Sequence, residues 1–267
     1  MTFEKIAYAV QDGVAVIELN DPPANTYSYE MMQEIDQAVL AARMDDAVHV
    51  ILITGAGEKF FCAGANINML KGASPAFKYY FCLHANETMN RLEQTPKLVI
   101  AALNGHTVGG GLEVAMAADI RVARAGAGKI GLPEVTLGVL PGTGGTQRLA
   151  RLIGKAKAIE LMATGTLMSF EDARALGLVN QVWGESELNG RTFRDAAIDY
   201  AKQFTPPHRA SRAVGHIKRA VQSGLEMSFT DGLALERELQ QRLFDSDDAK
   251  EGIAANLEKR KAAFKGY

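Results

Sequence analysis

The chain has 267 residues, of which 47% are hydrophobic and 22% charged, as is typical of one large soluble globular domain or of a domain with a helical appendage. Its formal net charge of −2 excludes a bulk attraction to nucleic acid or anionic membranes. The first residues, MTFEKIAYAV, do not show a basic segment followed by an apolar one, so we do not expect a secretory signal. No apolar run of about 18 residues occurs, and Cys62 and Cys82 lack metal or disulfide spacing. We therefore expect a cytoplasmic protein with reduced, buried thiols.

Strands and helices alternate along most of the chain, which indicates an α/β fold. A tight turn at Asp12-Gly13 joins the first two strands, and Ser28 can cap the first helix. Later apolar runs are typical of strands that are buried on both faces. The predicted strands cover residues 5–10, 14–19, 48–54, 98–103 and 119–124, and the predicted helices cover 28–43, 74–94 and the stretch from about 145.

Two further stretches define the organisation of the chain. Residues 55–70 read as a loop, and from 178–183 onward the pattern is almost entirely helical. The segment TPPH at 205–208 is the best candidate for a hinge. We predict an α/β core that carries the active site over residues 1–204 and a helical region for oligomerisation over 205–267.

Three consecutive glycines, Gly109 to Gly111, follow a predicted strand and precede a helix-like apolar run. The first N–H groups of a helix lack partners, so they can hold a developing negative oxygen, and the helix dipole assists them. The alternative is a close-packed turn without a ligand. Nucleotide-binding loops are excluded, because Gln147 stands at the third glycine of a GxGxxG pattern and no GxxxxGK[ST] occurs.

Two glutamates near these glycine-rich segments are candidates for acid/base chemistry. Glu113 falls in the first turn of the expected helix, where an ionised carboxylate is favoured and can act as a base. Glu134 follows Pro133 among apolar residues, and burial there would raise its pKa and let it hold a proton. Two carboxylates shifted in opposite directions form an acid/base pair if they meet in space, which spacing alone does not establish.

Three segments, at 60–67, 101–123 and 131–149, resemble in this order the crotonase superfamily and, within it, the enoyl-CoA hydratases. The similarity continues over 163–182 and 247–266, so it spans nearly the whole chain. It implies a spiral of ββα turns with a helical C-terminal region that packs trimers, often paired into hexamers. It also implies reversible hydration of a 2-enoyl-CoA to a 3-hydroxyacyl-CoA, with oxyanion amides on Ala65 and Gly110 and catalytic carboxylates on Glu113 and Glu134.

The same resemblance implies how the substrate is bound. The residues expected to contact the substrate, on or near the oxyanion loop, are Lys59, Ala63, Gly64, Ile67 and Gly109. Lys259 would reach a CoA phosphate from a neighbouring subunit. For each lysine, a solvated surface charge is the alternative. CoA belongs to the substrate, so no metal or redox cofactor is expected, and neither nucleic acid nor a membrane is an expected partner.

The sequence departs from the family pattern at a few positions. Asn66 replaces an acidic residue after the oxyanion alanine, and Thr26-Tyr27 replaces the last two residues of a common Asn-Ala-Leu segment. These changes put the acyl-chain preference in doubt. His106 lies inside the motif, but no carboxylate is evident to pair with it.

Other activities remain open at this point. A Δ3,Δ2-enoyl-CoA isomerase is the nearest alternative, although such enzymes usually keep only one of the two carboxylates. Dienoyl-CoA or acryloyl-CoA hydratases could use the same pair. A more distant alternative is an RNA-binding protein of this fold, for which the chain offers only short basic clusters at 218–219 and 259–261.

Overall fold

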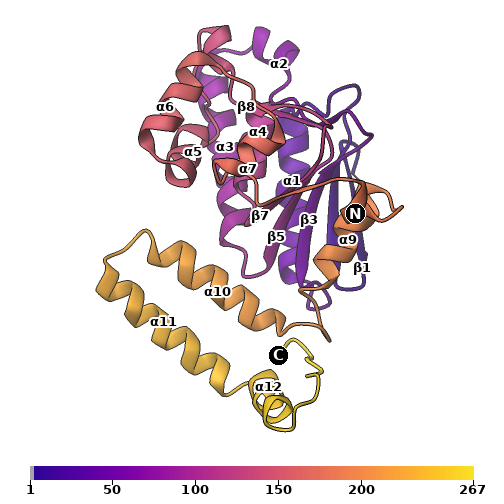
Figure 1. Ribbon diagram of the computed structural model, residues 1–267. Helices are drawn as coiled ribbons and strands as arrows, with labels where there is room; N and C mark the ends of the chain where they lie inside the picture. The colour runs from indigo at the N-terminus through magenta and orange to yellow at the C-terminus, as the bar shows by residue number, and fades with distance from the viewer. Residues whose placement is uncertain (1–2) are drawn as a thin grey trace.

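The computed structural model describes residues 3–267, and its centre is a six-stranded sheet (Figure 1). The strand order is β1-β2-β3-β5-β7-β9, in which β1 is antiparallel to β2 and all other neighbours are parallel. A smaller parallel sheet has the order β4-β6-β8. The strands are β1 Ile6–Gln11, β2 Val14–Leu19, β3 Val50–Gly55, β4 Phe60–Cys62, β5 Leu98–Leu103, β6 His106–Val108, β7 Ile120–Arg124, β8 Ile130–Gly131 and β9 Gln181–Trp183.

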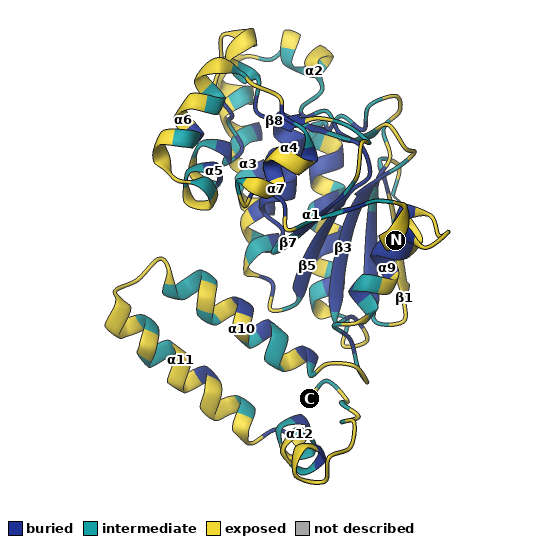
Figure 2. Ribbon diagram, viewed as in Figure 1, coloured by how far each residue is buried: buried dark blue, intermediate teal, exposed yellow. Residues whose placement is uncertain are grey.

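The central strands β3 and β5 are buried along their whole length, as their apolar runs predict, whereas most residues of the edge strand β1 are exposed (Figure 2). Successive side chains of a strand point to opposite faces, so alternate residues enter two separate cores. Ile17 and Ile53 belong to the core that contains residues of α1, whereas Val16 and Leu52 belong to the core that contains residues of α9. The sheet is thus the middle layer between these helices.

The helices begin where the sequence provides caps. Ser28 accepts a hydrogen bond from the Met31 amide at the start of α1, and Ser74 accepts one from the Phe77 amide at the start of α3. The helices are α1 Tyr29–Met44, α2 Ile67–Lys71, α3 Pro75–Gln94, α4 Gly110–Met116, α5 Gly145–Ile153, α6 Lys155–Thr164, α7 Phe170–Ala175, α8 Glu185–Leu188, α9 Phe193–Lys202, α10 Ser211–Gly224, α11 Phe229–Phe244 and α12 Asp247–Leu257, with a 3-10 turn η1 at Glu134–Leu137.

Two sequence predictions about local structure are wrong. The predicted loop at 55–70 contains β4 and most of α2, and Asn66 caps α2 by accepting hydrogen bonds from the amides of Asn68 and Met69. The stretch expected to be helical from 178–183 onward begins with β9, the last strand of the large sheet. Strands as short as three residues are too short to show a period of two.

The C-terminal helices α10, α11 and α12 lie at one end of the molecule, below the sheet in Figure 1. The predicted boundary at 204/205 falls between α9 and α10. A buried ion pair fixes α10 to the core, with Lys218 Nζ 2.9 Å from Asp119 Oδ2 and also donating to the carbonyls of Leu92 and Lys97. Within residues 3–267, no helix combines the length and apolar character that a membrane crossing requires.

Candidate active site

The three consecutive glycines lie at the junction of β6 and α4, and each is required for a different reason. Gly109 caps α4 with φ at 59°, a conformation that other residues rarely adopt, and a Cβ there would lie 3.0 Å from Glu134 Oε1. A Cβ on Gly110 would overlap the Tyr27 hydroxyl, and one on Gly111 would overlap the Cys62 carbonyl. The glycines therefore let the end of β4, a glutamate and a tyrosine approach one helix end.

Replacing Gly110 with alanine is expected to lower the free energy of unfolding by about 1–3 kcal/mol, the usual cost of overpacking a buried site. The added methyl group must displace the buried Tyr27 ring or shift the start of α4. Gly72→Ala is the matched control, because Gly72 has φ at −95° and nothing lies within 4 Å of a Cβ there. Urea unfolding measures both variants, and equal stabilities would contradict the close packing.

Glu113 lies in the first turn of α4, as predicted, and it is almost fully buried. Its Oε1 accepts hydrogen bonds from the amides of Thr143 at 2.8 Å and Gly145 at 2.7 Å. Its Oε2 accepts a hydrogen bond from the Thr143 hydroxyl. Gly145 is also the first residue of α5, so the carboxylate faces the N-terminal ends of two helices. All the hydrogen bonds that residues 3–267 form with this carboxyl group are donated to it, two by backbone amides and one by a hydroxyl.

Glu134 is the first residue of η1, and its carboxyl group lies beside Gly109. Burial, and then the negative charge of Glu113, raise the pKa of Glu134 to about 7. Its Oε2 is buried and has no hydrogen-bond partner within residues 3–267, which disfavours the ionised form further. The sequence correctly predicted that the pKa of Glu134 is raised, but it did not predict the full cause of the shift. The neighbouring Val135 and Leu137 side chains are exposed rather than packed around the carboxyl group.

The two predicted oxyanion amides lie on adjoining backbone segments. Tyr27 forms a parallel bridge with Ala65, in which Tyr27 donates to the Gly64 carbonyl at 3.0 Å and accepts from the Asn66 amide at 2.9 Å. In this pattern the N–H of Ala65 itself points away from Tyr27. Gly110 is the first residue of α4, and a Cβ on Gly64 would lie 2.9 Å from its amide nitrogen.

The remaining predicted binding residues are distributed more widely. Ala63 and Ile67 flank the Gly64-Ala65 segment, and Ile67 is exposed at the start of α2. Lys59 lies on the loop before β4, with its Nζ 5.6 Å from the centre of the Phe60 ring. Lys259 is exposed just after α12, at the end of the molecule opposite to α2 and α4 (Figure 1). One chain alone therefore does not bring Lys259 to the two glutamates.

His106 has a local structural contact that explains its position. Its Nδ1 accepts a hydrogen bond from the Lys129 amide at 3.1 Å, and its ring packs against Phe60. Cys62 is buried, and burial raises the pKa of its thiol to about 12. Cys82 is a free thiol that is only half-buried, so the expectation of buried thiols holds fully for Cys62 alone.

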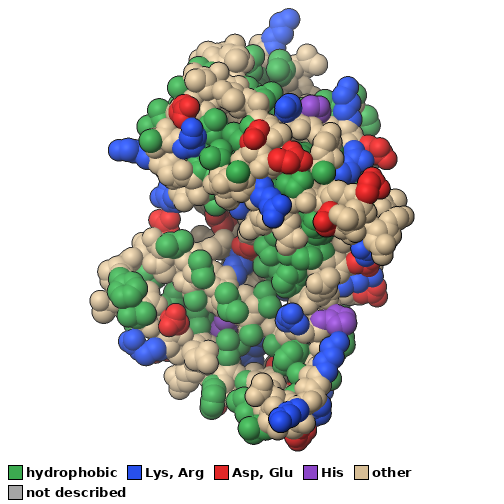
Figure 3. Space-filling model, viewed as in Figure 1, with side chains coloured by type: hydrophobic (Ala, Val, Ile, Leu, Met, Phe, Trp, Pro, Cys, Tyr) green, Lys and Arg blue, Asp and Glu red, His purple; other side chains and the backbone are tan. Residues whose placement is uncertain are grey.

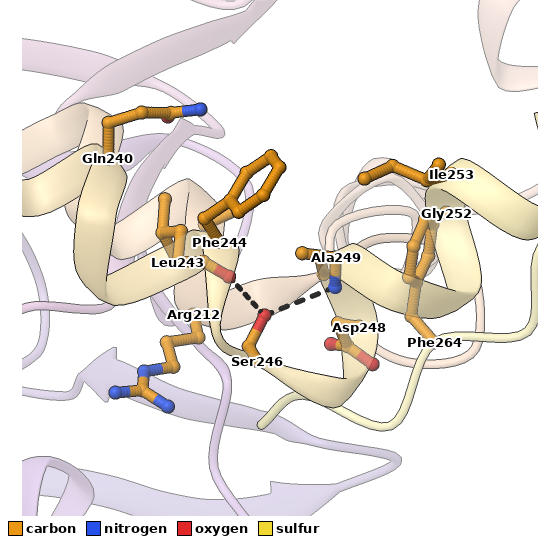
Figure 4. A pocket seen from close by; sticks show the side chains of 12 residues that line it. Arg212, Gln240, Leu243, Phe244, Ser246, Asp248, Ala249, Gly252, Ile253 and Phe264 are labelled. Carbon is orange, nitrogen blue, oxygen red and sulfur yellow. Dashed lines mark hydrogen bonds between the residues drawn. The ribbon is translucent and has the colours of Figure 1, made fainter.

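A partly open pocket of about 410 Å³ lies between α10, α11 and α12, away from the glutamates (Figure 4). Its wall includes Leu243, Phe244 and Phe264, and Ser246 links two of the helices by donating to the Leu243 carbonyl and accepting from the Ala249 amide. None of the predicted site residues lines this pocket.

Sequence reasoning missed three residues that contact the Glu113 carboxylate or its partners, namely Tyr27, Thr143 and Gly145. Thr143 and Gly145 lie in the glycine-rich segment at 141–148, whose sequence pattern does not indicate a contact with Glu113. Tyr27 was noted only as a departure from a family pattern. A buried tyrosine needs a partner for its hydroxyl, and that signal could have drawn attention to Tyr27.

The fold is that of the crotonases: a crystal structure of an enoyl-CoA hydratase from Geobacillus kaustophilus superimposes with a TM-score of 0.94 and 43% sequence identity, covering 100% of this chain and 98% of that one. The enoyl-CoA hydratase/isomerase family model matches residues 9–267. A probable enoyl-CoA hydratase from Bacillus subtilis is 38% identical over 98% of both chains. A crotonyl-CoA hydratase from Syntrophomonas wolfei is 37% identical over 99% of both. The chain therefore belongs to the enoyl-CoA hydratase/isomerase family.

Proposed function

We propose that the protein catalyses the reversible hydration of a 2-enoyl-CoA thioester to a 3-hydroxyacyl-CoA. The observation that carries this proposal is a pair of unlike carboxyl groups close enough for the charge of one to act on the other: Glu113 accepts hydrogen bonds from two amides and a hydroxyl, and Glu134 has a pKa raised to about 7. An ionised and a protonated carboxyl group in one site suit the removal of a proton from water and the delivery of another to carbon.

In this reaction the amides of Ala65 and Gly110 hold the thioester oxygen and stabilise the enolate character that develops as water adds. Glu113 takes a proton from the water whose oxygen bonds to C3, and Glu134 gives a proton to C2. Water is thereby added across the double bond, and exchange of protons with solvent restores both carboxyl groups. Nothing is oxidised or reduced, so the proposed step requires no redox cofactor, and CoA serves only as the carrier of the acyl group.

A panel of 2-enoyl-CoA thioesters of different chain length and unsaturation tests this proposal through the loss of conjugated absorbance. Hydration of crotonyl-CoA or a longer 2-enoyl-CoA supports it. The isomerase alternative is included in the description of the family, and it predicts a gain of conjugated absorbance from a 3-enoyl-CoA. That gain, without hydration of any 2-enoyl-CoA, would overturn the hydratase proposal.

We further propose that α10–α12 join chains into a trimer or a pair of trimers. These helices and their connections expose apolar side chains, visible in the lower part of Figure 3, and contiguous patches of this kind mark interaction surfaces. The exposed residues are Ile217, Val221, Leu225, Met227, Phe229, Leu233, Phe244, Ile253 and Leu257. Light scattering is expected to give three or six times the mass of one chain, and a monomer at working concentration would contradict the assembly.

In such an assembly, a neighbouring chain could bring Lys259 to the CoA phosphates, as the family resemblance implies. Lys59 would contact the same part of the substrate from its own chain. Both assignments, and the cytoplasmic location expected from the sequence, stay predictions.

A further inference from the structure

Two hydroxyl groups form a chain that ends on the Glu113 carboxylate. Thr143 Oγ1 donates to Glu113 Oε2, and the Tyr27 hydroxyl lies 3.2 Å from Thr143 Oγ1. A threonine hydroxyl carries one proton, and here that proton goes to the carboxylate, so Tyr27 must be the donor in the second bond. All three side chains are almost fully buried, and bulk solvent therefore does not compete for these bonds.

The contacts of Tyr27 fix the position of its hydroxyl group and therefore of the hydrogen bond between Tyr27 and Thr143. Its backbone pairs with the Ala65 segment, and its ring packs against Phe81 with the centroids 5.9 Å apart. Burial, and then the charge of Glu113, raise the pKa of Tyr27 well above its usual range, so its hydroxyl stays protonated and remains a donor. One residue thus connects the segment that carries a predicted oxyanion amide with the predicted base.

The hydrogen bonds of Glu113 leave one place for a further donor. A carboxylate offers about four acceptor positions, two on each oxygen. Two amides occupy both positions on Oε1, and the Thr143 hydroxyl occupies one on Oε2. Within residues 3–267 no donor occupies the fourth position, on Oε2, so a reacting water can donate to it.

We propose that Thr143 and Tyr27 are positioning residues that aim this free position of Glu113 Oε2 at the water. The proposal rests on the hydration reaction proposed above. The amides of Thr143 and Gly145 belong to the backbone and hold Oε1 whatever side chain stands at 143. The hydroxyl chain is a property of the side chains, so substitution can remove it without removing the amides.

The test compares crotonyl-CoA hydration by the full-length wild type and by Thr143→Val, Thr143→Ser and Tyr27→Phe. Valine keeps the shape of threonine without the hydroxyl, and we expect kcat to fall about 10- to 100-fold, the range for a lost hydrogen bond to a charged group, with KM within about 3-fold. Thr143→Ser is expected to restore most of kcat. Tyr27→Phe is expected to lower kcat about 3- to 10-fold, as for the loss of a bond between neutral groups.

Tyr8→Phe is the matched control, because Tyr8 lies on β1 and packs on Phe3 rather than near Glu113. A wild type without hydratase activity would overturn the proposed function itself. An active wild type with unchanged Thr143→Val and Tyr27→Phe variants would overturn only the positioning role. Equal losses in Thr143→Val and Thr143→Ser would also overturn it, since they would indicate packing rather than the hydroxyl. If Thr143→Val does not fold, Thr143→Ser and Tyr27→Phe still test the proposal. An unchanged kcat in Tyr27→Phe would show that the hydrogen bond between Tyr27 and Thr143 has no positioning role.

Discussion

Replacing Glu134 with glutamine is expected to lower kcat for crotonyl-CoA hydration about 10²- to 10⁴-fold, the usual contribution of a positioned acid or base. Glutamine fills the same space but cannot release a proton to C2. Glu134 can hold that proton near neutral pH because burial, and then the charge of Glu113, raise its pKa to about 7. The loss of conjugated absorbance measures the rate, and near-normal turnover by a folded variant would contradict the role.

The pH dependence of the wild type provides a second measurement of the same group. The proposed hydration requires Glu134 in its protonated form, so kcat/KM is expected to fall as the pH rises past about 7. Dehydration must show the same alkaline limb, because the reaction takes up no net proton and its equilibrium constant does not depend on pH. Both directions use one proton shared by the two carboxyl groups. A profile that stays flat from about pH 6 to about pH 9 would contradict this assignment.

The thermal stability of Glu134→Gln shows whether a loss of activity comes from the missing carboxylic acid or from misfolding. The folded pKa of Glu134 lies above its usual value of 4.5, so the protonated form favours folding and this contribution is lost as the pH rises from 4.5 through about 7. Glutamine cannot ionise. The Tm of Glu134→Gln above pH 7 is therefore expected to equal or exceed that of the wild type, and a markedly lower Tm would contradict the assigned environment.

Sequence patterns predicted every strand of the large sheet except β9, together with α1 and α3, because these elements depend on local properties. The strand predicted at 98–103 coincides with β5, and the helices predicted after Ser28 and Ser74 begin there because serine caps act within one turn. The small sheet escaped prediction because β4, β6 and β8 are only two or three residues long. Such strands are defined by their neighbours rather than by their own pattern.

In the candidate site too, features that depend on local sequence could be predicted, whereas contacts between distant residues could not. The position of Glu113 in the first turn of α4 is local, and it could be predicted from the glycines before it. The contacts of its carboxylate with Thr143 and Gly145 join residues about 30 positions apart, and the Tyr27–Thr143 bond joins residues 116 positions apart. No spacing rule reports such contacts. Only the fold shows that the residue replacing a common leucine has its hydroxyl beside Gly110.

Replacing Glu113 with glutamine is also expected to lower kcat about 10²- to 10⁴-fold, with little change in stability. The amide oxygen can stay with the two backbone donors of Thr143 and Gly145. The amide NH₂ group then faces Thr143 Oγ1, whose hydroxyl can rotate to accept from it. The variant thus keeps its hydrogen bonds but has no basic oxygen to take the proton of water.

The matched control is Glu185→Gln, which makes the same chemical change at an exposed glutamate on α8 and should leave kcat unchanged. Steady-state hydration of crotonyl-CoA, together with thermal unfolding, measures both variants. Because Glu113 would act on water and not on the thioester, KM is expected to change far less than kcat. A Glu113→Gln variant that is folded and retains more than about a tenth of the wild-type kcat would show that another group activates the water. A variant that loses affinity rather than kcat would assign Glu113 to substrate binding.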